Sequence, residues 1–315
     1  GEHGIQVLLA PIYLGYVHPF DNDGWYHEAL AAGVDACREW GRYVGKRYAG
    51  FDNIFWLMGG DRNPGDALDH VDAIVEGIQE FDQRHLFTAH TSSQRPPVVE
   101  YARGGWVDVN CTYTYAIVHQ MLLADYRRQP VRPFFLIESS YEGEHNSSPV
   151  QIRRQAYWAV LCGGCGQFIG NNPIWLYNHG WQEAMELPAS RDMVHLKGLF
   201  MSRPWFNLVP DEQHEVVVSG LGEYRGLDYV SAARTNDGGT VMAYMPTART
   251  IGVDLSWVCG KAAAAWWFNP RTGEAEHAGE FGTSGVCEFV PPGEGDWVLV
   301  LDDVGRGYAA PGVTG

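Results

Sequence analysis

The feature that most constrains the fold is an alternation of strand-like and helix-like segments over roughly the first 210 residues. Short apolar runs recur at residues 5–15, 53–60, 85–92, 106–115, 133–143 and 166–177. Amphipathic or apolar helical patterns occur between them, at residues 37–48, 68–81 and 149–164. Strands that alternate with helices indicate an α/β fold with a parallel sheet, and their spacing favours a (β/α)8-type TIM barrel.

The pattern changes after about residue 211. Short runs are then separated by turn signals, including NDGG at 236–239 and NPRTGE at 269–274, which are typical of β-hairpins. We therefore predict a barrel domain over residues 1–210 and a small antiparallel β-sandwich over residues 212–303. Residues 304–315 are predicted to form a flexible tail.

Two of the predicted barrel strands lead into an acidic residue. NIFWLMGGD is an apolar run, typical of a strand buried on both faces, that passes through two glycines to Asp61. PFFLIE delivers Glu138 directly from an apolar run, where an acid is costly to bury unless it is used or paired. Because polar groups at the carboxyl ends of barrel strands point into a crevice, both acids are candidates for a site. The alternative for Asp61 is that it caps the following helix.

Glycoside hydrolysis requires at least two carboxyl groups. One is protonated and donates its proton to the leaving oxygen, and the other is ionised and attacks the anomeric carbon. We predict Asp61 and Glu138 as this catalytic pair. Glu142 and Glu144 follow on the next loop and are either sugar ligands or solvated acids. Polar and aromatic residues near the ends of the runs are predicted to bind sugar, although each taken alone also suits a structural role: His90, Asn110, Tyr113, Tyr115, Tyr141 and Trp175.

Composition narrows the partners. Acidic residues outnumber basic ones 38 to 22, for a formal charge of −16, which disfavours nucleic acid and anionic membranes through repulsion. We find no apolar run long enough for a membrane span. The 12 Trp, 16 Tyr and 13 Phe suit stacking on a neutral oligo- or polysaccharide, or equally a core rich in rings.

Metal and redox chemistry have weaker support. CGGC at 162–165 has redox or metal spacing, but no second such motif accompanies it, so its cysteines are predicted to be packing residues. A metal-dependent hydrolase is an alternative that rests on five histidines without HxH or HExxH spacing: His18, His90, His119, His145 and His179. We therefore predict neither a metal nor a cofactor.

Several segments together resemble the apiosidase-like glycoside hydrolases of family 140. They are RYVGKRYAGFDNIFWLMGGDRN, FFLIESSYEGEH and QIRRQAYWAVLCGGCGQFIGNNPIW, and in the second domain AWWFNPRTGEAE and GDWVLVLD. In that family a barrel precedes a small β domain that carries a collagen-binding label. The resemblance implies cleavage of apiosyl linkages in plant pectin, with the acids at Asp61 and Glu138 as the catalytic pair.

The roles of the two acids are assigned by analogy at the level of the fold. In barrels whose acids end strands four and seven, the residue at Asp61 would be the acid/base and the residue at Glu138 the nucleophile. A retaining mechanism of this kind predicts carboxyl groups about 5–5.5 Å apart. The alternative is a non-catalytic carbohydrate-binding or adhesion protein with a relic barrel.

The resemblance also implies two further strands ahead of IQVLLAP. Only six strand-like runs precede the β domain, so the barrel is predicted to be incomplete at its amino terminus and the chain to be a fragment of a longer enzyme. The opening GEHGIQ has no signal-peptide pattern, yet the resemblance predicts a secreted or periplasmic protein.

Overall fold

The computed structural model describes residues 3–16 and 23–313. The chain divides into two compact units. The first contains Gly1–Thr114 and Arg128–Ile137, and the second contains Tyr115–Arg127 and Glu138–Gly315. Within the described ranges, no helix combines the length and apolar character that crossing a bilayer requires.

Parallel strands form the centre of the first unit. β1 (Val7–Leu9), β2 (Ile54–Gly59) and β3 (Phe87–His90) pair in that order, with both pairings parallel. β4 (Asn110–Tyr113) and β5 (Phe134–Glu138) form a two-stranded pair. These strands confirm the first five predicted positions. Among the described residues they do not close into a ring, so the eight-stranded barrel remains a prediction.

The two faces of β2 are unequally buried, although the sequence predicted burial of both. Ile54, Trp56 and Met58 are buried in the main core of the unit. Phe55 and Leu57, which point the other way, are half-buried, and Phe55 packs on a smaller apolar cluster with Phe135. The apolar run therefore serves one closed face and one partly open face.

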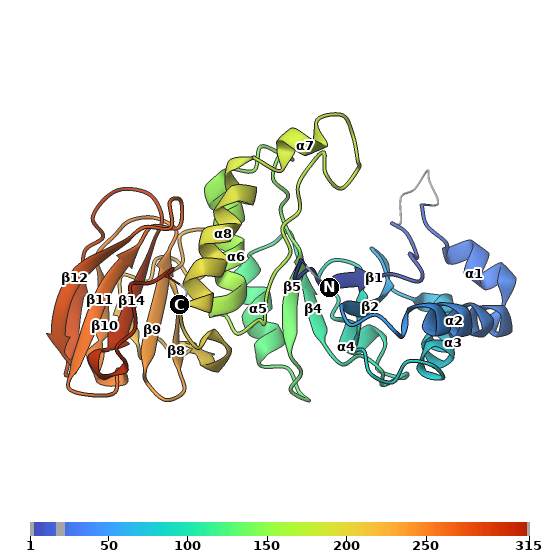
Figure 1. Ribbon diagram of the computed structural model, residues 1–315, viewed down its shortest axis with the longest axis horizontal. Coiled ribbons are helices and arrows are strands. Elements are labelled where there is room, and N and C mark those ends of the chain that lie inside the picture. Colours follow the sequence, from blue (N-terminus) through green and yellow to red (C-terminus); the bar gives the residue numbers. More distant parts are fainter. Residues whose placement is uncertain (1–2, 17–22, 314–315) are drawn as a thin grey trace. The chain divides into compact units, whose positions relative to one another are not determined.

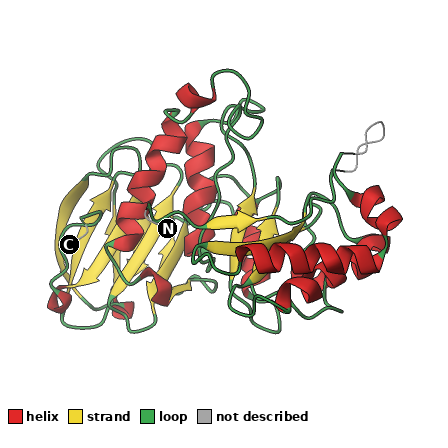
Figure 2. Cartoon of the chain, turned by 45° about the vertical axis from the view of Figure 1, so that its right-hand side comes forward, coloured by secondary structure: helices red, strands yellow, loops and turns green. Residues whose placement is uncertain are grey.

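Helices cover the closed face of this sheet: α1 (Tyr26–Ala32), α2 (Val34–Tyr48), α3 (Leu68–Gln79), α4 (Pro97–Glu100) and the short 3₁₀ turn η1 (Gly65–Ala67). α2 and α3 lie side by side, as Figures 1 and 2 show, and confirm the first two predicted helices. Their close approach depends on glycine: a Cβ at Gly41 or Gly77 would lie 2.2 Å from a backbone oxygen of the other helix.

The second unit contains α5 (Val118–Tyr126), α6 (Pro149–Leu161), α7 (Trp181–Ala184) and α8 (Pro188–Met201). α6 confirms the third predicted helix; Ser148 caps it through Oγ, which accepts from the Gln151 N–H, and Pro149 occupies its first turn. α6 contacts α8 and two strands of the carboxyl-terminal part, β8 (Ser231–Thr235) and β9 (Thr240–Met245) (Figure 1).

The predicted sixth strand at residues 166–177 is wrong. The segment has bridge residues only at Gln167 and Asn171, the latter paired in parallel with Glu142, and residues 172–177 form turns. Pro173 has no N–H to donate to a ladder, and Tyr177 has a φ of 53°, outside the extended region. Pro173 and the backbone at Tyr177 therefore prevent a strand from continuing after the bridge at Asn171.

The carboxyl-terminal part is an antiparallel β domain with two sheets, one in the order β12-β11-β14-β9-β8-β6 and one in the order β13-β10-β7. Residues of both sheets share one apolar core, as the sandwich prediction requires. The turns at 236–239 and 269–274 connect antiparallel neighbours, which confirms both hairpins. The strands are β6 (Leu208–Pro210), β7 (Val217–Ser219), β8 (Ser231–Thr235), β9 (Thr240–Met245), β10 (Ile251–Asp254), β11 (Ala262–Phe268), β12 (Ala275–Gly282), β13 (Val286–Phe289) and β14 (Trp297–Asp303), and the 3₁₀ turns are η2 (Trp205–Asn207), η3 (Leu255–Trp257) and η4 (Val304–Arg306).

The segment after β14 contradicts the predicted flexible tail. Buried Arg203 pairs with Asp302 and also donates to the Ala309 carbonyl at 2.8 Å. The same guanidinium lies 4.7 Å from the ring centroid of Tyr308, and the Gly312 N–H donates to Ser202 Oγ at 3.1 Å. Residues 304–313 are therefore fixed by a buried charge and backbone hydrogen bonds, whereas 314–315 lie outside the described residues.

Candidate active site

The end of β2 explains why two glycines precede Asp61. A Cβ at Gly59 would lie 2.5 Å from the backbone oxygen of His90, and a Cβ at Gly60 would lie 2.2 Å from the ring of Tyr13. Both glycines also have positive φ, at 80° and 126°, as does Asp61 at 47°. The glycines let the backbone turn in close contact with His90 and Tyr13, and the turn places Asp61 at the carboxyl edge of the sheet.

Asp61 has two identified polar neighbours in the first unit. The Tyr13 hydroxyl donates to Oδ2 at 2.7 Å, and His90 Nε2 lies 4.0 Å from Oδ1. His90 ends β3 level with Gly59, and its ring centroid is 4.8 Å from that of Tyr113. The structure therefore places the predicted residue His90 beside Asp61 and the predicted residue Tyr113 beside His90. Tyr13 was not predicted as a site residue, because it lies in an apolar run and no signal distinguishes it from a core ring.

Asn110 does not lie with this group. It begins β4, whereas Tyr113 ends the same strand. Its side chain is 2 % exposed, and Oδ1 accepts from the Val98 N–H in the first turn of α4 at 3.4 Å. This buried amide oxygen finds a partner in the backbone of α4, which suits a structural role, and the sugar-binding role of Asn110 stays a prediction.

Glu138 is the last residue of β5 and has its own tyrosine partner. The Tyr115 hydroxyl donates to Oε1 at 2.6 Å. Glu138 is half-buried and Tyr115 is exposed. The predicted residues Tyr115 and Glu138 therefore meet in the second unit. Each candidate acid thus ends or closely follows a strand and accepts a tyrosine hydroxyl.

The loops after β5 bring together the remaining predicted residues. The rings of Tyr141 and Trp175 meet edge to face, with centroids 6.4 Å apart. Trp175 Nε1 donates to Glu144 Oε1 at 2.7 Å, and Asn172 Nδ2 donates to the same oxygen at 2.9 Å. Glu144 is consequently more than a solvated loop acid.

Glu142 is structural. It is 4 % exposed, and its carboxylate accepts from the N–H groups of Ala189 and Ser190 at 2.7 and 2.8 Å, and from Ser190 Oγ at 2.8 Å. These donors belong to the first turn of α8, whose positive end favours a carboxylate. The Glu142 carboxylate therefore caps the amino terminus of α8.

The histidines of the metal alternative have different surroundings. His145 and His179 are exposed on loops, and His90 lies beside Asp61. His119 is fully buried between rings, 4.3 Å from the centroid of Tyr229 and 4.6 Å from that of Trp158. His18 lies outside the described residues.

His119 predicts a pH dependence of stability. Burial lowers its pKa from 6.5 to about 4. Nε2 bonds the Tyr224 carbonyl at 2.6 Å, Nδ1 has no partner among the described residues, and the nearby Arg154 also disfavours protonation. The unfolded state therefore binds a proton first as the pH falls through 6.5, and stability is lost down to about pH 4. Titration of this group should lower the free energy of unfolding by about 3 kcal/mol over that window.

The measurement is the free energy of unfolding against pH for the wild type and for His119→Phe, which keeps a ring but cannot titrate. Carboxylates titrate in both proteins, so the difference between the two curves isolates His119. We expect the wild type to lose more stability than the variant between pH 6.5 and 4. Parallel curves would show that the imidazole does not contribute.

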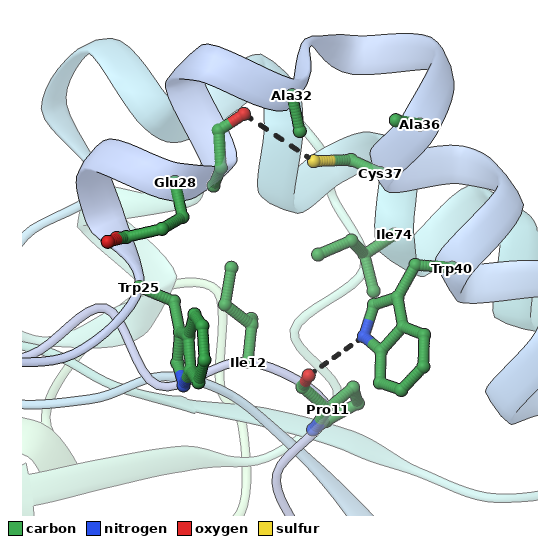
Figure 3. A pocket seen from close by; sticks show the side chains of 10 residues that line it. Pro11, Ile12, Trp25, Glu28, Ala32, Ala36, Cys37, Trp40 and Ile74 are labelled. Carbon is green, nitrogen blue, oxygen red and sulfur yellow. Dashed lines mark hydrogen bonds between the residues drawn. The ribbon is translucent and has the colours of Figure 1, made fainter.

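The first unit also has a mainly apolar pocket of about 450 Å³ between α1, α2, α3 and the segment after β1 (Figure 3). Ile12, Ile74, Trp25 and Trp40 are among the residues that line it. The Trp40 Nε1–H donates to the Pro11 carbonyl at 2.9 Å. None of the predicted site residues lines this pocket.

Comparisons with known proteins identify both parts of the chain. Residues 1–207 match the family model described as "Apiosidase-like, catalytic domain", and residues 209–302 match the one described as "Putative collagen-binding domain of a collagenase". No curated protein matches the sequence.

Solved structures of glycoside hydrolases are similar. One described as a glycoside hydrolase is 26% identical, with a TM-score of 0.79, over 87% of this chain and 70% of that one. A glycoside hydrolase family 5 protein from Bacteroides vulgatus ATCC 8482 is 24% identical, with a TM-score of 0.86, over 99% and 74%. The second likeness shows the fold alone. The model of the apiosidase-like catalytic domain matches residues 1–207, most of the chain. The chain therefore belongs to the apiosidase-like family and has a glycoside hydrolase-like catalytic domain.

Proposed function

We propose that this protein is a retaining glycosidase that hydrolyses O-glycosidic bonds in plant pectic polysaccharide, with apiosyl linkages as its target. The observation that carries the proposal is the matched setting of Asp61 and Glu138. Each lies at the carboxyl end of a strand and accepts a tyrosine hydroxyl, at 2.7 and 2.6 Å. The pectic target rests on the resemblance to family 140.

In this mechanism Glu138 is the nucleophile. Its carboxylate attacks the anomeric carbon and forms a glycosyl-enzyme, which water then hydrolyses. The hydrogen bond donated by Tyr115 orients the carboxylate and suits an ionised group.

Asp61 is the acid/base. It protonates the leaving oxygen in the first step and removes a proton from the attacking water in the second. Tyr13 holds Oδ2, so Oδ1 is the oxygen left for proton transfer, with His90 Nε2 4.0 Å away. Because the substrate is a wall polymer, we place the enzyme in the periplasm or outside the cell.

The test is a screen on pectic side-chain oligosaccharides, followed by product analysis and by proton NMR of the first-formed anomer. We expect release of a sugar, apiose in particular, with the configuration of the substrate. A product with inverted anomeric configuration would show that Glu138 is not a nucleophile. Binding without any product would favour the non-catalytic alternative.

A further inference from the structure

The loop at residues 171–181, here called the aromatic loop, presents large rings to solvent. Trp175 is 57% exposed and Tyr177 is 77% exposed. A single exposed ring is common on protein surfaces. Two exposed rings in one short loop, with a third ring at Trp181, form an aromatic cluster. Clusters of this kind mark binding sites.

Trp175 is held by specific contacts. Its indole N–H donates to Glu144 Oε1, and the Asn172 amide donates to the same oxygen. No described residue donates to Glu144 Oε2. The indole is therefore fixed in orientation beside a carboxylate oxygen that still has acceptor capacity.

A fixed ring beside an acceptor suits a sugar. The C–H face of a sugar stacks on an aromatic plane, while its hydroxyl groups donate to a carboxylate. A purely apolar ligand would not use the carboxylate, and an ionised uronic acid unit would be repelled by it, so the unit beside Glu144 is a neutral sugar.

A second pair of rings lies further along the loop. The ring centroids of Tyr177 and Trp181 are 5.2 Å apart with planes at 43°. Tyr177 has a φ of 53°, a backbone conformation that is uncommon for a bulky residue. The backbone is therefore strained at Tyr177, which has the most exposed ring of the loop.

We propose that the aromatic loop binds sugar units beyond the bond that is cleaved, and that Glu144 is the positioning residue for Trp175. The inference rests on the proposed function and deepens it: the substrate is an oligosaccharide longer than a disaccharide. Trp175 and Glu144 contact one unit, and the Tyr177 and Trp181 pair contacts another.

The test compares kcat/KM on pectic side-chain oligosaccharides from disaccharide to hexasaccharide. In Trp175→Ala we expect the loss to grow with length and to be about tenfold greater for the hexasaccharide than for the disaccharide, mainly through KM. Glu144→Ala should show the same length dependence, and Glu144→Gln, which keeps the acceptor for Trp175, should recover part of it. Phe206→Ala, which removes a 73% exposed ring elsewhere in the second unit, should leave the length dependence unchanged.

A loss that is equal at all lengths, or no loss, would overturn the proposal. Calorimetric binding of the hexasaccharide to Glu138→Gln separates this inference from the proposed function. If the hexasaccharide binds and Trp175→Ala weakens the binding while the wild type releases no product, the aromatic loop stands and the glycosidase assignment fails. If it does not bind, the aromatic loop proposal fails.

Discussion

Glu138→Gln is expected to lower turnover by at least about a thousandfold, because an amide cannot form the glycosyl-enzyme. Asp61→Asn removes the proton donor and should lower turnover by about 10²- to 10⁴-fold on substrates with a poor leaving group. Both changes keep side-chain size. The Tyr13 and Tyr115 hydroxyls can still donate to the remaining amide oxygens.

The measurements are kcat and KM on the active pectic oligosaccharide, with thermal unfolding of each variant. Glu280→Gln, which removes an exposed carboxylate from β12, is the matched control and should retain the wild-type rate. Azide provides a test of the roles. It should restore activity to Asp61→Ala with retention and to Glu138→Ala with inversion, since it then replaces the lost nucleophile. A near-normal rate in either isosteric variant would contradict the catalytic pair.

Arg153→Met is expected to destabilise the protein by about 3 to 5 kcal/mol. The Arg153 side chain, on α6, is 7% exposed and donates to both oxygens of Asp296 at 2.8 Å and to Asp192 at 2.7 Å. Tyr244 also donates to Asp296, at 3.0 Å. Methionine fills much of the volume but removes the cation that Asp192 and Asp296 share, and Asp296 keeps only the longer contact with Arg271 at 3.9 Å. The loss of this shared cation is the main cost.

Chemical denaturation at neutral pH measures this effect. The matched control is Arg306→Met, because Arg306 pairs with Asp237 at the same 2.7 Å but the two side chains are 38% and 43% exposed. Solvent screens that pair, so the control should lose little or no stability. Equal losses in the two variants would show that burial of the Arg153 network does not determine its contribution.

Sequence periodicity alone predicted the elements that depend on local patterns. Apolar runs located β2 and β5, helical stripes located α2 and α3, and turn signals located the hairpins at 236–239 and 269–274. The same reasoning placed Asp61 and Glu138 at strand ends. These features follow from local backbone geometry and side-chain alternation, which the order of residues records directly.

Tertiary structure decided which residues serve as partners. Nothing in the sequence indicates that Tyr13 donates to Asp61, that Glu144 holds Trp175, or that Asn110 bonds α4 instead of lying at the sheet edge. A hydrogen bond depends on which groups approach within about 3 Å after the chain folds, and residues distant in sequence supply most of these groups.

The same reason explains the two elements that were predicted wrongly. Residues 166–177 have an apolar pattern suited to a strand, but they form only isolated bridges at Gln167 and Asn171, because Pro173 and the turns that follow cannot continue a ladder. Residues 304–313 have a loose composition, yet buried Arg203 and Ser202 hold them through backbone contacts. By itself the sequence determined the types of most elements and the positions of the two acids. The contacts that fix the tail, orient the acids and hold Trp175 were decided only when distant side chains met in the folded chain.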